Sequence, residues 1–157
     1  MSESNEFLCA KYFLMEYVID KTTLYDLIDE EVSRMADRAY AEDGTSLYDA
    51  VRILDRDADM IDRMVSDSVS TLVSRFRNVL ALVSTESGVS LSLYLPDMEE
   101  TMQPVAYDEL TRFLVMQTVA LWSQLKSTQE YEGYVARATA ALDKAEMALL
   151  TRRRPTR

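Results

Sequence analysis

Hydrophobic residues recur at helical spacing over most of the chain. In residues 23–41 an apolar stripe follows a Thr23-x-x-Asp26 cap, and Gly44 comes shortly after it. The stripe consists of Leu24, Leu27, Ile28, Val32, Met35, Ala36 and Ala39. Spacings of three and four residues place side chains on one helical face, and glycine favours the backbone conformation that closes helices. The pattern predicts an amphipathic helix over 23–41.

A second apolar stripe begins near Ser46 and continues to Val79. Its members are Leu47, Val51, Leu54, Ala58, Ile61, Val65, Ser68, Leu72 and Phe76. The spacing predicts one long helix whose seam faces other helices. The serine-rich residues 66–74 count against it, since serine and threonine favour helices less and can bend them.

The period changes at residues 89–95, VSLSLYL. Apolar and polar residues alternate there, which is typical of a strand with one buried face. The turn-like residues 84–88 precede this strand, so residues 80–83 are a candidate partner arm of a hairpin. Residues 96–104 are acidic and bounded by prolines, which predicts a loop.

Two further helices are predicted in the C-terminal part. Residues 104–125 are apolar around most of the helical circumference, so this helix should be buried on several sides. Ser127 and Glu130 form a capping-box pattern that opens the last helix. The stripe of that helix is rich in alanine, and Pro155 cannot continue it.

Residues 7–19, FLCAKYFLMEYVI, are apolar and aromatic without a clear period. They fit a helix or a strand, and we favour a helix. The resulting fold class is mostly α: an antiparallel helical bundle of about four helices, one of them long, with a small β-hairpin or single strand near residues 80–95. We expect residues 1–157 to form a single helical domain in which 152–157 are a basic C-terminal tail.

The composition argues against most enzyme chemistry. The chain has no histidine and one cysteine, Cys9. These numbers exclude an internal disulfide and nucleophile sites that need histidine, and they leave Cys9 as a small buried hydrophobic residue. No glycine-rich phosphate loop is present. We therefore expect no enzyme, no cofactor and no metal.

Asp55, Asp57 and Asp59 resemble the first half of a calcium-binding loop. The pattern then fails, because Met60 and Ser66 stand where such a loop needs glycine and glutamate. We interpret the segment as a solvated helix face with ion pairs to Arg52 and Arg63. A carboxylate-based metal site here is the less favoured alternative.

Other acidic and aromatic residues have structural interpretations. The acids of 29–31 and 97–100 are typical of an outer surface. Trp122, Tyr131 and Tyr134 lie on apolar stripes without interleaved basic residues, which favours core or subunit contacts over stacking with bases.

The charge balance is acidic overall and basic at the end. The formal net charge is −10, which disfavours general binding of nucleic acid. The last six residues nevertheless carry a basic cluster with one proline: Arg152, Arg153, Arg154, Pro155 and Arg157. Two interpretations of this cluster are about equally favoured: its cations offset the dipole at a helix end, or it is a peptide that docks on an acidic partner. Weak contact with nucleic acid ranks third.

No membrane segment is predicted. The apolar stretches are short or interrupted by Arg112, Gln117 and Gln124. The chain begins MSESNEF without a basic leader, so we expect a soluble protein that is not exported by a standard signal.

The part from Tyr107 onward resembles the C-terminal half of head–tail connector proteins of tailed bacteriophages and prophages, the adaptor or head-completion class. The resemblance covers an apolar helix with an aromatic near its end (YDELTRFLVMQTVALWSQL), a polar break (KSTQEYEGY), an alanine-rich helix (VARATAALDKAEMALL) and the basic end RRRPTR. It extends over about a third of the chain.

The resemblance implies a structural virion protein of the neck, made in the cytoplasm of the bacterial host. Such subunits form a homo-oligomeric ring, usually twelvefold, between the portal protein and the tail or neck proteins. DNA passes through the ring without sequence-specific binding. Arg152, Arg153, Arg154, Pro155 and Arg157 would then be a C-terminal hook for the portal or a neighbouring subunit. The alternatives are another virion accessory or tail-completion protein, or a cellular helical adaptor.

Overall fold

A computed structural model describes residues 12–126 and 128–152, so the expectations for Cys9, Ser127 and residues 153–157 lie outside the described residues. In chain order the elements are β1 (Tyr12–Asp20), α2 (Lys21–Asp37), α3 (Tyr48–Val51), a 3-10 turn at Asp55–Asp57, α4 (Ala58–Phe76), β2 (Leu80–Ser84), β3 (Gly88–Pro96), a 3-10 turn at Glu100–Met102, α5 (Gln103–Leu125) and α6 (Tyr131–Leu150). The predicted class is confirmed: the fold is mostly helical, with a small antiparallel sheet.

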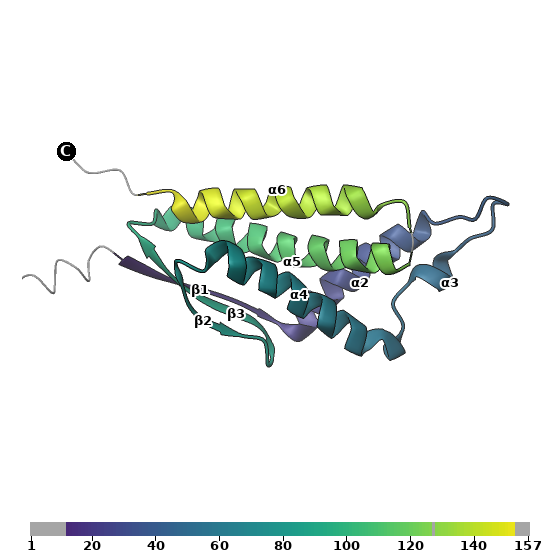
Figure 1. The fold of residues 1–157 in the computed structure, drawn as a ribbon, viewed down its shortest axis with the longest axis horizontal. Helices are drawn as coiled ribbons and strands as arrows, with labels where there is room; N and C mark the ends of the chain where they lie inside the picture. The colour runs from purple at the N-terminus through teal and green to yellow at the C-terminus, as the bar shows by residue number, and fades with distance from the viewer. Residues whose placement is uncertain (1–11, 127, 153–157) are drawn as a thin grey trace, which may run out of the picture.

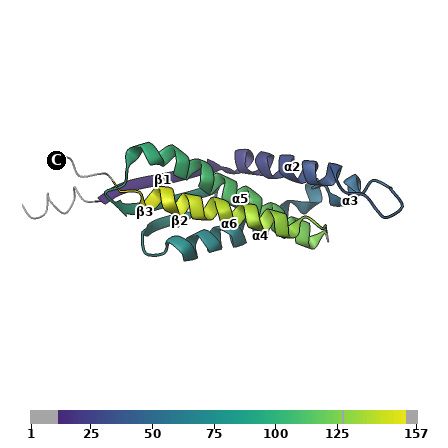
Figure 2. The same ribbon diagram turned by 90° about the horizontal axis from the view of Figure 1, so that it is seen from above.

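Helix α5 is the centre of the molecule. Helix α6 runs antiparallel along it, and α2 and α4 lie on its two flanks (Figure 1; Figure 2). Residues on several sides of α5 are buried, among them Leu110, Leu114 and Trp122. The burial on several sides that its apolar circumference predicts is therefore confirmed.

Helix α6 packs against α5 through small side chains. Ala138, Ala141, Ala145 and Ala148 are all buried on its inner face. Because alanine occupies little space, the two helix backbones can pack closely where these residues meet α5. The alanine-rich stripe of the sequence thus forms the contact between the last two helices.

The sheet lies at one end of the molecule and has the strand order β1-β3-β2, with both pairings antiparallel (Figure 1). The alternation in 89–95 is confirmed, since Val89, Leu91, Leu93 and Leu95 of β3 are buried. The predicted hairpin partner is also present, because residues 80–84 form β2. A register shift between Leu80 and Leu82 interrupts the β2–β3 ladder.

The prediction of a helix in residues 7–19 is wrong for the part that the structure describes. Residues 12–20 form β1, which pairs with β3 over its whole length, from Tyr12↔Pro96 to Asp20↔Gly88. Met15, Tyr17 and Ile19 face the core, while Leu14 and Val18 are exposed. The exposed leucine and valine on the outer face obscured the strand period.

The prediction of one long helix over residues 46–79 is also wrong. The chain forms the short α3, turns at Arg52 in an extended conformation, and starts α4 only at Ala58. The indole N–H of Trp122 donates a hydrogen bond of 2.7 Å to the carbonyl of Val51 at this break. In an uninterrupted helix, that carbonyl would accept from the backbone N–H four residues later.

Helix α2 begins earlier and ends earlier than predicted, at Lys21 and Asp37. Its cap is the carboxylate of Asp20, which accepts from the backbone N–H and the hydroxyl of Thr23. These hydrogen bonds lower the pKa of Asp20 below its ordinary value. Thr23 therefore serves as the partner of the cap and not as the cap.

No helix among the described residues is long and apolar enough to cross a membrane.

Candidate functional site

The chain leaves α6 through a fixed connection that we call the C-terminal junction, made of Met98, Glu99, Thr151 and Arg152. Thr151 is the C-cap of α6 and has an extended backbone. Its carbonyl accepts a hydrogen bond of 3.0 Å from the backbone N–H of Glu99. Arg152 and Met98 form an antiparallel β-bridge, and the Met98 side chain is buried. The junction thus holds the base of the tail against the loop that follows β3.

The side chains around the junction are mainly acidic. Asp97 and Glu100 are exposed, Glu99 is half-buried, and Arg152 is exposed. Asp97 has a φ of 47°, which turns the chain sharply after Pro96. The predicted loop at 96–104 is shorter in the structure, because β3 ends at Pro96, a 3-10 turn forms at Glu100–Met102 and α5 begins at Gln103. The junction places one cation of the tail beside the acidic residues that remain between β3 and this turn.

The end of α6 bears on the interpretation that the tail arginines offset the dipole of this helix. Helix α6 has no basic residue in its last turn, because it ends at Leu150. Arg152 lies two residues beyond the helix, in extended chain. Arg153, Arg154, Pro155 and Arg157 lie outside the described residues, so only Arg152 of the predicted hook has a described position.

Exposed apolar side chains occur in the elements that meet at this end of the molecule. The start of β1, the end of β3, the start of α5 and the end of α6 all lie there (Figure 1). The exposed residues in these segments are Leu14, Tyr94, Val105, Met147 and Leu150. Met147 is 72% exposed, which is high for a large apolar side chain in a folded domain. This end therefore combines apolar surface with the base of a basic tail.

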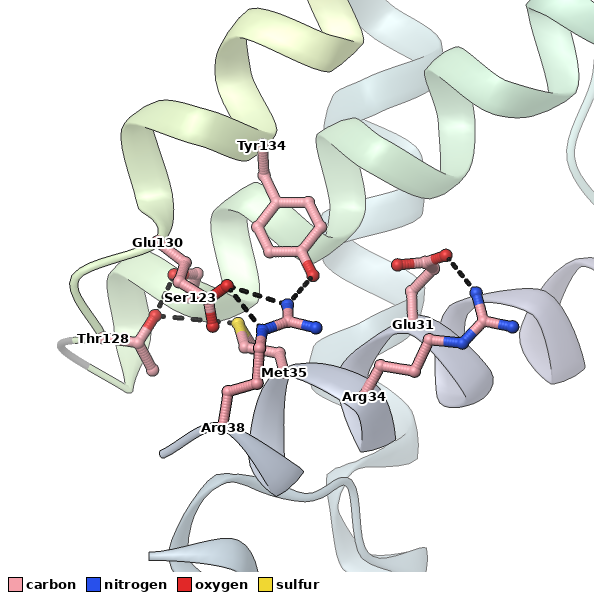
Figure 3. A network of polar contacts seen from close by, with 8 residues as sticks. All are labelled: Glu31, Arg34, Met35, Arg38, Ser123, Thr128, Glu130 and Tyr134. Carbon is pink, nitrogen blue, oxygen red and sulfur yellow. Dashed lines mark hydrogen bonds and ion pairs between the residues drawn. The ribbon is translucent and has the colours of Figure 1, made fainter. Parts of the chain in front are cut away.

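A polar network fixes the opposite end of the helical layer (Figure 3). Arg38, the C-cap of α2, donates to a carboxylate oxygen of Glu130 at 2.7 and 3.0 Å and to the hydroxyl of Tyr134 at 3.0 Å. These partners raise the pKa of Arg38, with the hydrogen bond to Glu130 as the main cause. Glu130 thus joins α2 to the start of α6. Helix α6 begins at Tyr131 with Glu130 as its N-cap residue, so the helix starts later than the capping-box prediction had it.

Thr128 extends this network on the turn between α5 and α6. Its hydroxyl contacts that of Ser123 and lies 3.6 Å from the sulfur of Met35 (Figure 3). The network joins neighbouring elements through hydrogen bonds and an ion pair, so it is a structural connection between α2 and the α5–α6 turn. A cavity of about 370 Å³ borders it and is lined by Arg38, Thr128 and Glu130, among other residues.

The other buried polar groups also connect elements. Ser68 of α4 and Thr118 of α5 are buried and lie 3.3 Å apart at their hydroxyls. Tyr17 of β1 hydrogen-bonds to Thr111 of α5 at 2.8 Å, and burial raises the pKa of Tyr17. Each pair satisfies polar atoms at an interface between two elements, which such buried groups require.

The acidic segments singled out in the sequence do not converge. Among residues 12–126 and 128–152, no group of three or more cysteine, aspartate or glutamate side chains has a geometry that could hold a metal ion. The expected ion pairs of Asp55 with Arg52 and of Asp59 with Arg63 are not among those of the described residues, and Arg52 pairs with Asp49 instead. Trp122 and Tyr134 are buried in the core, and Tyr131 is half-buried.

Sequence reasoning found the basic tail but missed the residues that hold it. Met98, Glu99 and Thr151 contribute through backbone pairing between segments some fifty positions apart in the chain. Backbone pairing of this kind leaves no residue pattern, so no signal in one sequence identifies it.

Comparisons with protein-family models, with curated proteins and with solved structures found no match to this chain.

Proposed function

We propose that this chain is a structural subunit that assembles with its own copies into a ring and joins two larger assemblies, as a head–tail connector of a tailed bacteriophage or prophage does. Its partners are the portal protein on one side and tail or neck proteins on the other. The ring is twelvefold in the connectors it resembles. The subunit carries no catalytic function in this proposal, and DNA passes through the ring without being read.

The single observation that carries this proposal is that the C-terminal junction fixes the start of the tail to the loop after β3. A helix end that only offsets its dipole would carry cations in its last turn, and α6 has none there. The backbone bonds of Thr151 and Arg152 to residues 98–99 instead give the basic segment a fixed starting point at one end of the molecule. A fixed starting point lowers the entropic cost of docking a short peptide on a partner.

The apolar surface at the same end gives independent support. Met147 and Leu150 are three residues apart and so lie on one face of α6, and adjoining exposed apolar side chains can mark contacts with other proteins. The side chains of Met147 and Leu150 precede the tail directly on α6. A partner that receives the tail would cover them as well, which adds apolar burial to ion pairing.

Co-expression with the portal protein encoded in the same genome tests the proposal. We expect the two proteins to co-purify and to form rings visible by electron microscopy. Arg153→Ser with Arg154→Ser should weaken capture by the portal about tenfold, because each guanidinium pairs with a carboxylate in a partly desolvated site. Arg63→Ser with Arg77→Ser is the matched control, since both residues are exposed and carry no ion pair within the described ranges.

Three outcomes would contradict the connector role. The chain could be absent from purified virions and form no ring beside its portal. It could co-purify with tail proteins alone, which would identify a tail-completion protein. Binding to DNA that falls steeply with salt, and is lost in the tail variant alone, would identify a nucleic-acid function instead.

A further inference from the structure

A groove of about 400 Å³ lies between the first half of α2 and the start of α4. Its floor is apolar, because Ile28 and Ile61 are buried and Ile53 is half-buried. Its rim carries the exposed carboxylates of Asp26, Asp29 and Asp55. We call this feature the acidic groove.

The three carboxylates of the acidic groove are not neutralised by the groove itself. No lysine or arginine lines it, and none of the three aspartates forms an ion pair within the part of the chain that the structure describes. Other acids nearby are paired, as Asp62 is with Lys21 and Asp49 with Arg52. An apolar floor beneath unpaired carboxylates is complementary to a cation on an apolar stem. Arginine has this form, and its guanidinium binds carboxylates in a two-pronged geometry.

We propose that the acidic groove binds the C-terminal segment, residues 152–157, of a second copy of this chain. That segment carries four arginines and one proline and no acidic side chain. Its guanidinium groups pair with Asp26, Asp29 and Asp55, and the ring of Pro155 and the arginine methylenes cover the isoleucine floor. The inference rests on the proposed function in one respect, since it names the neighbouring subunit as one receptor of the hook.

The same chain cannot fill its own groove. Arg75, near the end of α4, pairs with Asp143 of α6 at 3.2 Å and also with Glu146. The end of α4 therefore lies beside the last turns of α6. The acidic groove lies at the other end of α4, at Ala58 and Ile61, which is about 21 to 26 Å from Arg75 along the helix.

The tail is too short to cover this distance. Residues 153–157 span at most about 18 Å when fully extended. They also start from the C-terminal junction, and the end of α6 lies at the end of the molecule opposite α3 (Figure 1). An occupant with this sequence must therefore come from another copy.

A contact between the tail of one copy and the groove of the next uses two different surfaces of the subunit. Such a head-to-tail contact repeats from copy to copy and closes into a ring when the rotation per subunit allows. The inference therefore supplies one contact through which this chain forms the proposed ring.

A peptide-binding experiment tests the inference. The probe is a fluorescein-labelled peptide TRRRPTR, and the protein is the full-length chain with its own Arg152, Arg153, Arg154 and Arg157 replaced by serine, so that its tail does not compete. We expect saturable binding by fluorescence anisotropy. The triple change Asp26→Asn, Asp29→Asn, Asp55→Asn should weaken that binding about tenfold, since three partly exposed ion pairs are lost.

The matched control removes the same charge elsewhere. Asp67→Asn, Asp108→Asn and Glu132→Gln change exposed acids that have no ion pair within the described ranges, and they should alter affinity less than about twofold. Circular dichroism melts of both triple variants verify that they fold. Equal weakening by the two triple changes, or no binding of the peptide, would overturn the inference.

A charge exchange gives a second and independent readout. Arg153→Glu with Arg154→Glu should abolish self-association in sedimentation velocity, and adding Asp26→Arg with Asp29→Arg should restore it. Failure of this rescue in folded protein overturns the inference.

Capture by the portal is measured in parallel. If capture persists while the groove fails to bind the peptide, the connector role stands and the inference falls. If the groove binds the peptide but the portal does not capture the chain, the inference stands and the connector role falls.

Discussion

Trp122 connects the centre of the molecule to the point where the second predicted helix breaks. Its indole N–H bonds to the carbonyl of Val51, and both residues are buried. The bond replaces one that a continuous helix would have formed. A single side chain thus stabilises the turn that separates α3 from α4.

We expect Trp122→Phe to lower the free energy of unfolding by about 1–3 kcal/mol, because the carbonyl of Val51 loses its donor while it stays buried. Urea denaturation followed by circular dichroism measures this change. Tyr40→Phe is the control, since Tyr40 is 62% exposed and its hydroxyl has no hydrogen bond within the described chain. A loss no larger than that of the control would show that the Val51 bond contributes little.

Asp20 gives the start of α2 a dependence on pH. Its pKa is lowered in the folded protein, chiefly by the hydrogen bond from the Thr23 hydroxyl. A carboxylate with a lowered folded pKa stabilises the fold above its unfolded pKa of about 3.9, and this contribution disappears as pH falls through the folded value.

Asp20→Ala should therefore lower the Tm at pH 7, and its difference from the unaltered chain should shrink as the pH falls below about 4. Thermal melts at a series of pH values test this expectation. Asp67→Ala serves as the control, because the carboxylate of Asp67 is exposed and caps no helix. A difference between Asp20→Ala and the unaltered chain that stays constant across pH would rule out the ionised cap as its cause.

The capping residues illustrate what local pattern can and cannot specify. An Asp-x-x-Thr and a Thr-x-x-Asp arrangement overlap at Thr23, and either could begin a helix. Pairing of residues 12–20 with β3 decides the matter, since it holds Asp20 in the extended conformation that a cap requires.

At the scale of elements, the pairing of β1 with β3 depends on Gly88. This residue has a φ of 139°, and a Cβ at this position would lie 2.1 Å from the carbonyl oxygen of Ile19. A side chain here would clash with the backbone of the neighbouring strand. The close approach therefore requires glycine.

Gly88→Ala should destabilise the chain by about 1–3 kcal/mol, since the backbone conformation is strained for alanine and the neighbouring strand must shift. Gly133→Ala is a matched control in α6, where a new Cβ meets no atom within 4 Å. It should stabilise the helix by up to about 1 kcal/mol. Chemical denaturation of both variants tests the pair, and equal effects would contradict the role given to Gly88.

The elements differ in how far the sequence predicts them. Residues 89–95 were predictable because serine and leucine alternate strictly, so the buried face is unambiguous. Residues 14–20 have the same period of burial, but apolar residues occupy both faces. Residues 46–79 do carry apolar residues at helical spacing. The helix is nevertheless broken after Val51, where the carbonyl accepts a hydrogen bond from the distant Trp122.

At the scale of the whole molecule, the sheet and the helices share one hydrophobic core. Buried residues from β1, β3, α2, α4, α5 and α6 form a single cluster. Because no element has a separate core, we expect the described part of the chain to unfold as one cooperative unit.

Two probes test this cooperativity. The fluorescence of Trp122, the only tryptophan of the chain, reports on the helical centre. Amide hydrogen exchange of β1 and β3 reports on the sheet. Both should give the same free energy of unfolding, and a sheet that opens well below the global value would divide the molecule into two units.

The candidate sites follow the same division between local and long-range information. The basic tail is visible in the sequence because four arginines in six residues need no partner to be recognised. The C-terminal junction and the acidic groove are not visible, because each joins segments that are distant along the chain. Asp55 was identified in the sequence, but its place beside Asp26 and Asp29 depends on how α2 packs near the start of α4.

By itself, the sequence determined the mostly helical class, the burial of the helix at 103–125, the hairpin of β2 and β3, and the basic character of the C-terminal end. Each of these is encoded in the spacing or type of neighbouring residues. The tertiary structure alone decided that residues 12–20 are a strand, that the second helix breaks at Arg52, and where the tail starts. The reason is that backbone groups pair with whatever donor or acceptor the packed chain brings to them, and no local pattern specifies that partner.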